Sequence, residues 1–144
     1  LWERRTTAHR SGEPLDLLSL PDLVQAKKTQ RDKDWPMLRR LIEANYFAHH
    51  DRPSQQQASF WLAELRSADL LIEVARRFAD GCAELTPRRP LLALAAADAP
   101  TALETALRAE EERERAADRA YWAPLKKVLE QLRRAARGSL EPDV

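Results

Sequence analysis

Apolar residues recur at helical spacing along most of this chain. From residue 54 to residue 85 they follow alternating steps of four and three positions, which is typical of helices that pack against a core. The members of this stripe are Trp61, Leu65, Ala68, Ile72, Ala75, Ala79 and Cys82. A second helical face follows Trp35-Pro36 and consists of Leu38, Leu41, Ile42 and Tyr46. Ser67 is a residue type that caps helices, so we expect the long stripe to be divided there.

The N-terminal part holds the only stretch that favours a strand. Residues 1–14 are polar and predict an irregular segment, whereas residues 15–18 form a short apolar run. Because one strand cannot satisfy its own backbone groups, this run would need a neighbouring strand. Ser19, with Asp22 three positions later, predicts the start of a helix over 21–29. A charged turn over 30–34 would follow it.

The C-terminal half is divided by proline. Residues 86–90 predict a linker, residues 90–97 a short apolar helix and residues 101–137 a long helix. We therefore expect a mainly α fold, a helical bundle of about five or six helices with at most one short N-terminal strand.

Two features of the long helix carry further expectations. Its middle, residues 108–115, is polar on every side and predicts a solvent-exposed helix supported by pairs such as Glu104–Arg108 and Glu111–Arg115. Pro124 lacks a backbone donor, and its ring opposes the carbonyl of Ala120, so a kink or break is expected there.

Composition narrows the class of protein. The chain has 144 residues, of which 44% are hydrophobic and 33% charged, a mixture that indicates one soluble helical domain. Its 24 basic and 23 acidic residues balance, which argues against a global nucleic-acid footprint. No apolar run approaches the roughly 20 residues that span a bilayer, so we expect no membrane association. A single cysteine, Cys82, favours a reducing compartment and hence the cytoplasm.

The order of elements near the N-terminus resembles that of a known family. The stretch LSLPDLVQAKKTQRDKDW gives an apolar strand, a helix in which a small residue precedes a lysine pair, and an Arg/Lys-rich turn with aspartate. This order resembles the closing segment of nucleotidyltransferase-like domains, including minimal nucleotidyltransferases and abortive-infection toxins. The resemblance covers roughly residues 15–45. Leu1 lies within the pattern of LWERR, and we interpret the chain as processed or as a fragment.

The resemblance implies a chemistry. Such proteins transfer a nucleoside monophosphate from a nucleoside triphosphate to an acceptor with Mg²⁺. Lys27 matches the lysine expected to contact the triphosphate, and Asp34 matches the supporting acid in the turn. Lys28, Arg31 and Lys33 are alternative cations for phosphate. The acceptor stays open between tRNA, a protein and a small molecule.

The part of that site which binds metal is missing from the sequence. A Gly-Ser loop and a strand-borne Asp-x-Asp pair precede this segment in the family, and neither precedes it here. Catalysis by this chain alone is therefore not expected, and a missing N-terminal half or a partner chain would have to supply the acids. Residues 1–47 would end the catalytic domain, residues 54–137 would form a helical accessory module, and residues 138–144 a flexible tail.

The same residues also have plainer interpretations. The charged residues between Lys27 and Asp34 are equally typical of a solvated helix end and turn. His49-His50-Asp51 is better explained by polar helix termination than by zinc, because adjacent helical side chains diverge by about 100°. Cys82 lies on the apolar stripe and is most simply a small core residue.

Three further groups have both a functional and a structural interpretation. Glu111, Glu114 and Asp118 lie near one helical face and could bind a cation, but the interleaved arginines favour a salt-bridged helix. The aromatic residues are core or interface anchors before they are base-stacking platforms, namely Trp35, Trp61, Tyr121 and Trp122. A basic cluster could touch phosphate or complement the negative end of the last helix, namely Lys126, Lys127, Arg133, Arg134 and Arg137.

A hypothesis of a different class remains beside the nucleotidyltransferase. The long amphipathic helices would also suit a helical interaction module without chemistry, such as an antitoxin-like protein or a scaffold.

Overall fold

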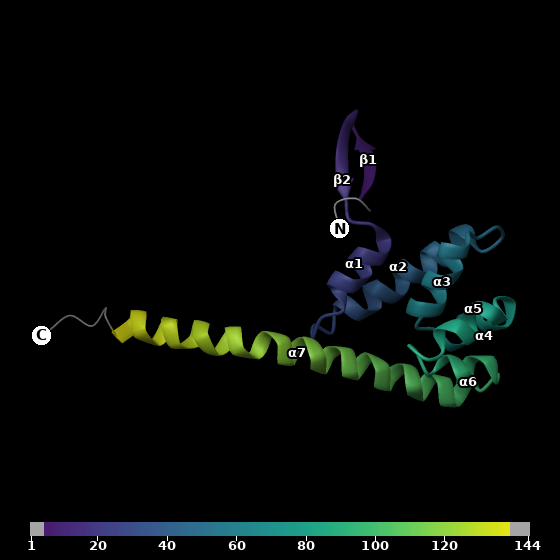
Figure 1. Cartoon of the computed structure of the whole chain (residues 1–144). Helices are drawn as coiled ribbons and strands as arrows, with labels where there is room; N and C mark the ends of the chain where they lie inside the picture. The colour runs from purple at the N-terminus through teal and green to yellow at the C-terminus, as the bar shows by residue number, and fades with distance from the viewer. Residues whose placement is uncertain (1–4, 139–144) are drawn as a thin grey trace, which may run out of the picture.

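The chain is mainly helical. The computed structural model describes residues 5–138, in which it forms seven helices and one two-stranded sheet (Figure 1). These elements are β1 Thr6–Arg10, β2 Glu13–Leu17, α1 Leu20–Lys27, α2 Asp34–His49, α3 Gln55–Glu64, α4 Ala68–Arg77, α5 Ala79–Leu85, α6 Leu92–Ala96 and α7 Pro100–Gly138. The predicted fold class, mainly α with a short N-terminal strand region, is confirmed. The tail expected over 138–144 lies, except for Gly138, outside the described residues.

The strand near the N-terminus has a partner that the sequence pattern did not reveal. β1 and β2 pair antiparallel, with Thr6 opposite Leu17 and Arg10 opposite Glu13. Residues 6–10 were expected to be irregular, and that expectation is wrong. Ser11 and Gly12 join the strands with φ values of 55° and 86°, the left-handed pair typical of a two-residue hairpin loop. The hairpin stands away from the helices in Figure 1, and Leu15 and Leu17 are exposed.

Local capping explains where the first helices begin. Ser19 accepts a hydrogen bond from the backbone nitrogen of Asp22 at 3.3 Å, so α1 begins at the predicted place. At α3, the Ser54 side chain accepts from the Gln57 backbone, and the Gln57 side chain accepts from the Ser54 backbone. This reciprocal pair is a capping box, which fixes the start of α3 after the turn that follows α2.

One hydrophobic core joins residues from α1 to the first half of α7. Its fully buried members include Val24, Trp61, Leu65, Leu71, Leu92 and Leu103. The predicted division at Ser67 is present, since α3 ends at Glu64 and α4 begins at Ala68. A second division at Phe78 separates α4 from α5, and no helix-breaking residue marks it in the sequence. The apolar stripe is buried as expected except at Ala79, which is exposed. Of the two divisions that split it into three short helices, the sequence indicated only the one at Ser67.

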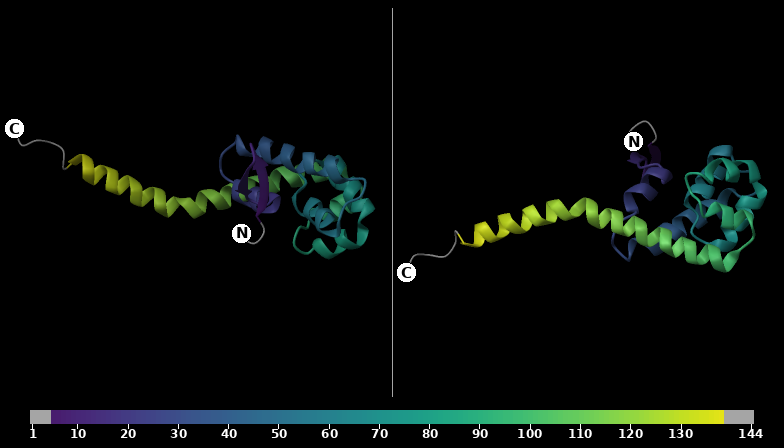
Figure 2. Two further views of the ribbon diagram at one scale, coloured as in Figure 1. Left: turned by 90° about the horizontal axis from the view of Figure 1, so that it is seen from above. Right: turned by 60° about the horizontal axis from the view of Figure 1, so that its bottom comes forward.

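The last helix runs far beyond the bundle. α7 has 39 residues, and its C-terminal half projects away from the other helices in all views of Figures 1 and 2. The helix is continuous through Pro124, so the expected break is absent, and the ribbon only curves gently. Among the described residues, no helix combines the length and apolar character needed to cross a membrane.

Candidate functional site

The residues that carry the family resemblance surround one turn. Lys27 is the last residue of α1 and Asp34 is the first residue of α2, so the two enclose residues 28–33. The Lys27 ammonium lies 3.8 Å from the Asp34 carboxylate. Asp34 is buried, and its carboxylate accepts a hydrogen bond of 2.7 Å from the Thr29 hydroxyl. The structure therefore brings these two predicted residues together.

The charge state of Asp34 follows from its contacts. The Thr29 hydrogen bond lowers the pKa of this carboxyl, and the charges of Lys27, Arg31 and Lys33 add to that effect against the opposing effect of burial. Asp34 is therefore a carboxylate at neutral pH. Its hydrogen bond within the turn makes it a residue that shapes the turn, which agrees with the supporting role implied by the resemblance.

Lys27 and Arg31 line one open pocket, and Lys28 is not among its lining residues. The pocket has a volume of about 510 Å³ and lies between the turn and α7. Its lining includes Lys27, Arg31, Asp34, Trp122 and Lys126. The Lys27 side chain is 39% exposed and can meet an anion in this pocket. Three cations and an aromatic ring beside one pocket could hold a phosphorylated ligand.

The far wall of this pocket comes from residues that are distant in sequence. Asp118 accepts hydrogen bonds from the Gln30 backbone at 2.9 Å and from the Trp122 ring nitrogen at 3.0 Å. Lys126 donates to the Gln30 side chain at 3.1 Å. These contacts fix the turn against α7. Because they join positions 88 and 96 residues apart, no local sequence signal announced them.

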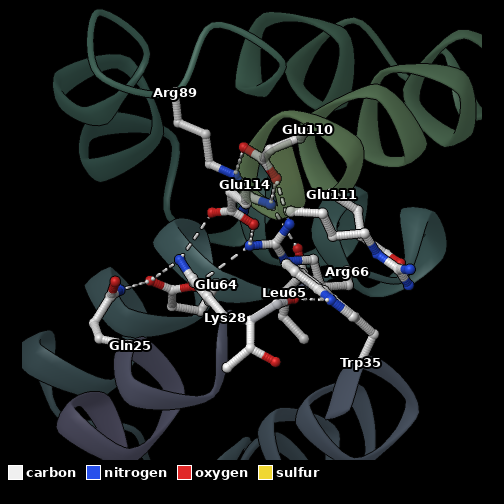
Figure 3. A network of polar contacts seen from close by, with 12 residues as sticks. Gln25, Lys28, Trp35, Glu64, Leu65, Arg66, Arg89, Glu110, Glu111 and Glu114 are labelled. Atoms are coloured by element: carbon white, nitrogen blue, oxygen red, sulfur yellow. Dashed lines mark hydrogen bonds and ion pairs between the residues drawn. The ribbon is translucent and has the colours of Figure 1, made fainter. Parts of the chain in front are cut away.

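Lys28 is instead part of a buried network of charges (Figure 3). Its ammonium lies 2.7 Å from Glu64 and 3.1 Å from Glu114. Arg66 lies 3.1 Å from Glu110 and 2.7 Å from Glu114. The three cations of the network are Lys28, Arg66 and Arg89, and its three carboxylates are Glu64, Glu110 and Glu114. The charges cancel, and Lys28 is not available to a nucleotide.

Arg89 links this network to the end of a helix. Its guanidinium donates to both carboxylate oxygens of Glu110, at 3.0 and 2.8 Å. It also donates to the carbonyls of Leu62 and Leu65, each at 2.8 Å. These carbonyls belong to the last turn of α3, where a cation also complements the helix dipole. The predicted linker at residues 86–90 thus carries a residue that ties α3 to α7.

The network corrects one expectation about α7. Residues 108–115 were expected to be solvent-exposed, yet Glu110 and Glu114 are covered by Arg66, Arg89 and Lys28. The pairs Glu104–Arg108 and Glu111–Arg115 are both present. An amphipathic pattern cannot reveal a polar face that packs against other charges. The cation-binding interpretation of Glu111, Glu114 and Asp118 gains no support, because each side chain contacts a different partner.

Trp35 forms a platform between two guanidinium groups. The Arg66 and Arg115 guanidinium carbons lie 5.3 and 5.4 Å from its ring centre. The Trp35 ring nitrogen donates to the Thr29 carbonyl at 2.8 Å. Trp35 is therefore a structural anchor that connects the network to the turn beside Lys27.

A pH dependence of stability follows from Glu110. Burial raises the pKa of this carboxyl, but the hydrogen bonds and charge of Arg89, with Arg66 and Lys28, outweigh burial and leave the pKa below its ordinary value of 4.5. A lowered pKa in the folded state means that the stabilisation is complete above the ordinary value and is lost as the pH falls through the lowered one.

We expect Glu110→Gln to destabilise the protein by about 1.5–3 kcal/mol at neutral pH, the range for hydrogen bonds to charged groups. The difference from wild type should shrink as the pH falls below the ordinary value of 4.5, because unfolding wild-type protein then takes up a proton at Glu110, and below the lowered pKa the folded protein is neutral there as well. Urea unfolding at a series of pH values measures this difference. A difference that stays constant down to pH 3 would contradict the assignment.

The other residues with a possible chemistry have structural roles. His50 contacts the carbonyl of Phe47 at 3.0 Å and lies 3.4 Å from Asp51. Cys82 is buried, and burial raises the pKa of its thiol, which disfavours the nucleophilic thiolate. Both observations agree with the plainer interpretations.

The described residues contain no donor set suited to magnesium. Within residues 5–138, no group of three His, Cys, Asp or Glu side chains is placed to hold a metal ion. Asp32 and Asp34 have Asp-x-Asp spacing, but Asp32 pairs with Arg115 while Asp34 bonds to Thr29. The residues present therefore do not fit the Mg²⁺ that the resemblance implies, and no reaction step is assigned to them.

Comparison with known proteins assigns neither a family nor a function to this chain. No family model, no curated protein and no solved structure matches this chain.

Proposed function

We propose that residues 1–47 are the closing segment of a nucleotidyltransferase-like catalytic domain. In this proposal Lys27 contacts the phosphates of a nucleoside triphosphate, and Asp34 maintains the turn that presents Lys27. The whole protein would transfer a nucleoside monophosphate to an acceptor. The metal-binding acids would come from a preceding segment or a partner chain. The observation that carries the proposal is the partly exposed Lys27, held by a buried Asp34 at a pocket whose lining has three cations and two carboxylates.

The hairpin supports this proposal independently of the pocket. β1 and β2 are paired only with each other within the described residues, so each has an outer edge with unpaired backbone groups. A two-stranded hairpin is marginally stable by itself in water. Leu15, Leu17 and Leu18 are 43%, 50% and 45% exposed, which is unusual for three apolar residues so close together. A sheet from a catalytic unit would pair with the edge and cover these side chains.

Nucleotide binding by the chain tests the role of Lys27. Removing a charge-assisted hydrogen bond costs about 1.5–3 kcal/mol, so Lys27→Ala should weaken binding of ATP with Mg²⁺ by roughly 10- to 100-fold. Isothermal titration calorimetry with ATP, GTP and CTP measures the effect. Lys33→Ala is the matched control, because Lys33 is an exposed lysine near the same turn that does not line the pocket.

Two results would argue against this function. If Lys27→Ala and Lys33→Ala weaken binding equally, the turn is only a solvated helix end. A second, inexpensive observation is the coding sequence upstream of Leu1. A Gly-Ser loop followed by Asp-x-Asp on a strand supports the proposal. A start codon directly before Leu1 refutes a preceding segment as the source of the acids, so that a partner chain would have to supply them.

A second candidate function is a helical interaction module without chemistry. It is favoured by one observation, the exposed apolar side chains on the projecting half of α7. Trp122, Leu125 and Leu129 also line the pocket of the nucleotide proposal, whereas Tyr121, Val128 and Leu132 do not. A chain that binds no nucleotide but binds a partner through α7 would establish this second function.

A further inference from the structure

The C-terminal half of α7 carries an apolar face that the rest of the described chain leaves exposed. We call it the α7 stripe, and its members are Tyr121, Trp122, Leu125, Val128, Leu129 and Leu132, which are 41–76% exposed. Their spacing of three and four residues places them on one side of the helix. From Tyr121 to Leu132 the stripe is ~18 Å long at 1.5 Å per residue. A continuous exposed stripe of this kind marks an interaction site.

The charges beside the stripe are arranged on one edge only. Arg119, Lys126 and Arg133 are spaced seven residues apart and form a basic row along that edge. The opposite edge is formed by Pro124, Gln131 and Ala135, which carry no charge. Residues 119–138 contain six basic residues and one acidic residue. A partner that pairs with both features needs an apolar face and acidic side chains along the facing edge.

The shape beside the stripe favours a helix as its occupant. Trp122, Leu125 and Leu129 also line the pocket whose other wall is the turn after α1. A rod-like helix can enter such a concave space, whereas a flat bilayer cannot follow it. A second copy of this chain is also disfavoured. Antiparallel pairing would bring the two basic rows together, and parallel pairing would set each basic row against an uncharged edge.

We propose that the α7 stripe binds an amphipathic helix of a partner protein that carries acidic side chains every seven residues beside its apolar face. The apolar residues of the partner pack on the stripe, and its carboxylates pair with the basic row. This inference deepens the second candidate function and does not depend on nucleotide binding.

A synthetic peptide of roughly 21 residues serves as the probe, long enough to form a helix on binding. It has leucine at alternating steps of three and four, and glutamate every seventh residue on one edge. Binding to the full chain is measured by fluorescence anisotropy. Leu132→Asp should weaken binding about tenfold or more, because it replaces an apolar contact of the stripe with a charge. Gln131→Asp is the matched control, because it adds the same charge one residue away and outside the stripe.

A pair of charge reversals tests the basic row. Lys126→Glu with Arg133→Glu should weaken binding of the glutamate peptide roughly tenfold and strengthen binding of a lysine version of it. Lys127→Glu with Arg134→Glu makes the same change in net charge on the face opposite the stripe and should leave the preference unchanged. If the two double variants change peptide binding equally, the basic row does not pair with the partner, and this part of the proposal is overturned.

Two further measurements separate this partner from other occupants. The first measurement is binding to vesicles that contain phosphatidylserine, and the second is dimerisation in sedimentation. If the chain shows either property, Leu132→Asp abolishes that property and the peptide does not bind, the partner-helix inference is overturned. That result keeps the second candidate function. If Leu132→Asp changes neither vesicle binding, nor dimerisation, nor peptide binding, the partner-helix inference and the second candidate function are both refuted. Leu132 does not line the pocket beside Lys27, so none of these outcomes affects the nucleotide test.

Discussion

Replacing Arg66 with methionine is expected to lower the free energy of unfolding by about 3–5 kcal/mol, the cost of removing one partner of a buried ion pair. The Arg66 side chain is only 5% exposed and contacts Glu110 and Glu114 at 3.1 and 2.7 Å. Methionine keeps much of the apolar contact with Trp35 but removes the charge. Three carboxylates would then face only Lys28 and Arg89. Urea unfolding at neutral pH, followed by circular dichroism, measures the loss.

A second substitution distinguishes unpaired charge from lost packing. Adding Glu114→Gln to Arg66→Met restores the charge balance, so part of the lost stability, about 1–2 kcal/mol, should return. Arg108→Met is the control, since this exposed arginine lies 4.0 Å from Glu104 on the same helix. Its effect should stay within about 0.5 kcal/mol. If Arg66→Met costs no more than Arg108→Met, the network does not hold α7 on the bundle.

The network also shows which parts of the fold were predictable. Helix spacing and capping residues revealed the core stripe and the starts of α1 and α4 because these are local signals. β1 was missed because its residues are mostly polar. The local indication of a hairpin is the dipeptide Ser11-Gly12, and this dipeptide indicates a hairpin turn only when strands flank it. The long helix expected over 101–137 is present as α7, and of the kink or break expected at Pro124 the break is absent. Proline removes one hydrogen bond, and in so long a helix the remaining bonds keep the helix continuous.

The candidate site was predictable only in part, because some of its residues are brought together by the packing of helices that are distant in sequence. Lys27 and Asp34 are seven residues apart, and the resemblance to the family was enough to link them. Trp122 and Lys126 reach the same pocket from α7, and that contact depends on how the helices pack. Lys28 was an alternative cation for phosphate, but one residue further along the helix turns its side chain towards Glu64. The side chains of neighbouring helical residues diverge by about 100°. For this reason Lys27 lies at the pocket and Lys28 lies in the network.

Trp61→Ala is expected to have an effect of similar size in the apolar core. Trp61 is 0% exposed, and its ring lies 5.0 Å from that of Tyr46 in an edge-to-face arrangement. Its ring nitrogen donates to the Asn45 side chain at 2.9 Å. Truncating a buried tryptophan to alanine costs about 3–5 kcal/mol, and here it also leaves the Asn45 oxygen without its donor. Urea unfolding measures this loss too.

Trp122→Ala is the matched control for Trp61→Ala, because the same atoms are removed from a side chain that is 41% exposed on the α7 stripe. We expect it to change the free energy of unfolding by less than about 1 kcal/mol. Trp61→Phe should have an intermediate effect and keeps the comparison possible if Trp61→Ala does not fold. If both alanine variants cost the same, then Trp61 does not contribute more to the core than an exposed tryptophan does. If instead Trp61→Ala is costly and Trp122→Ala is not, Trp122→Ala also serves as a variant for the peptide experiment: we expect it to weaken peptide binding, and that loss can be attributed to the stripe because the fold that presents it is intact.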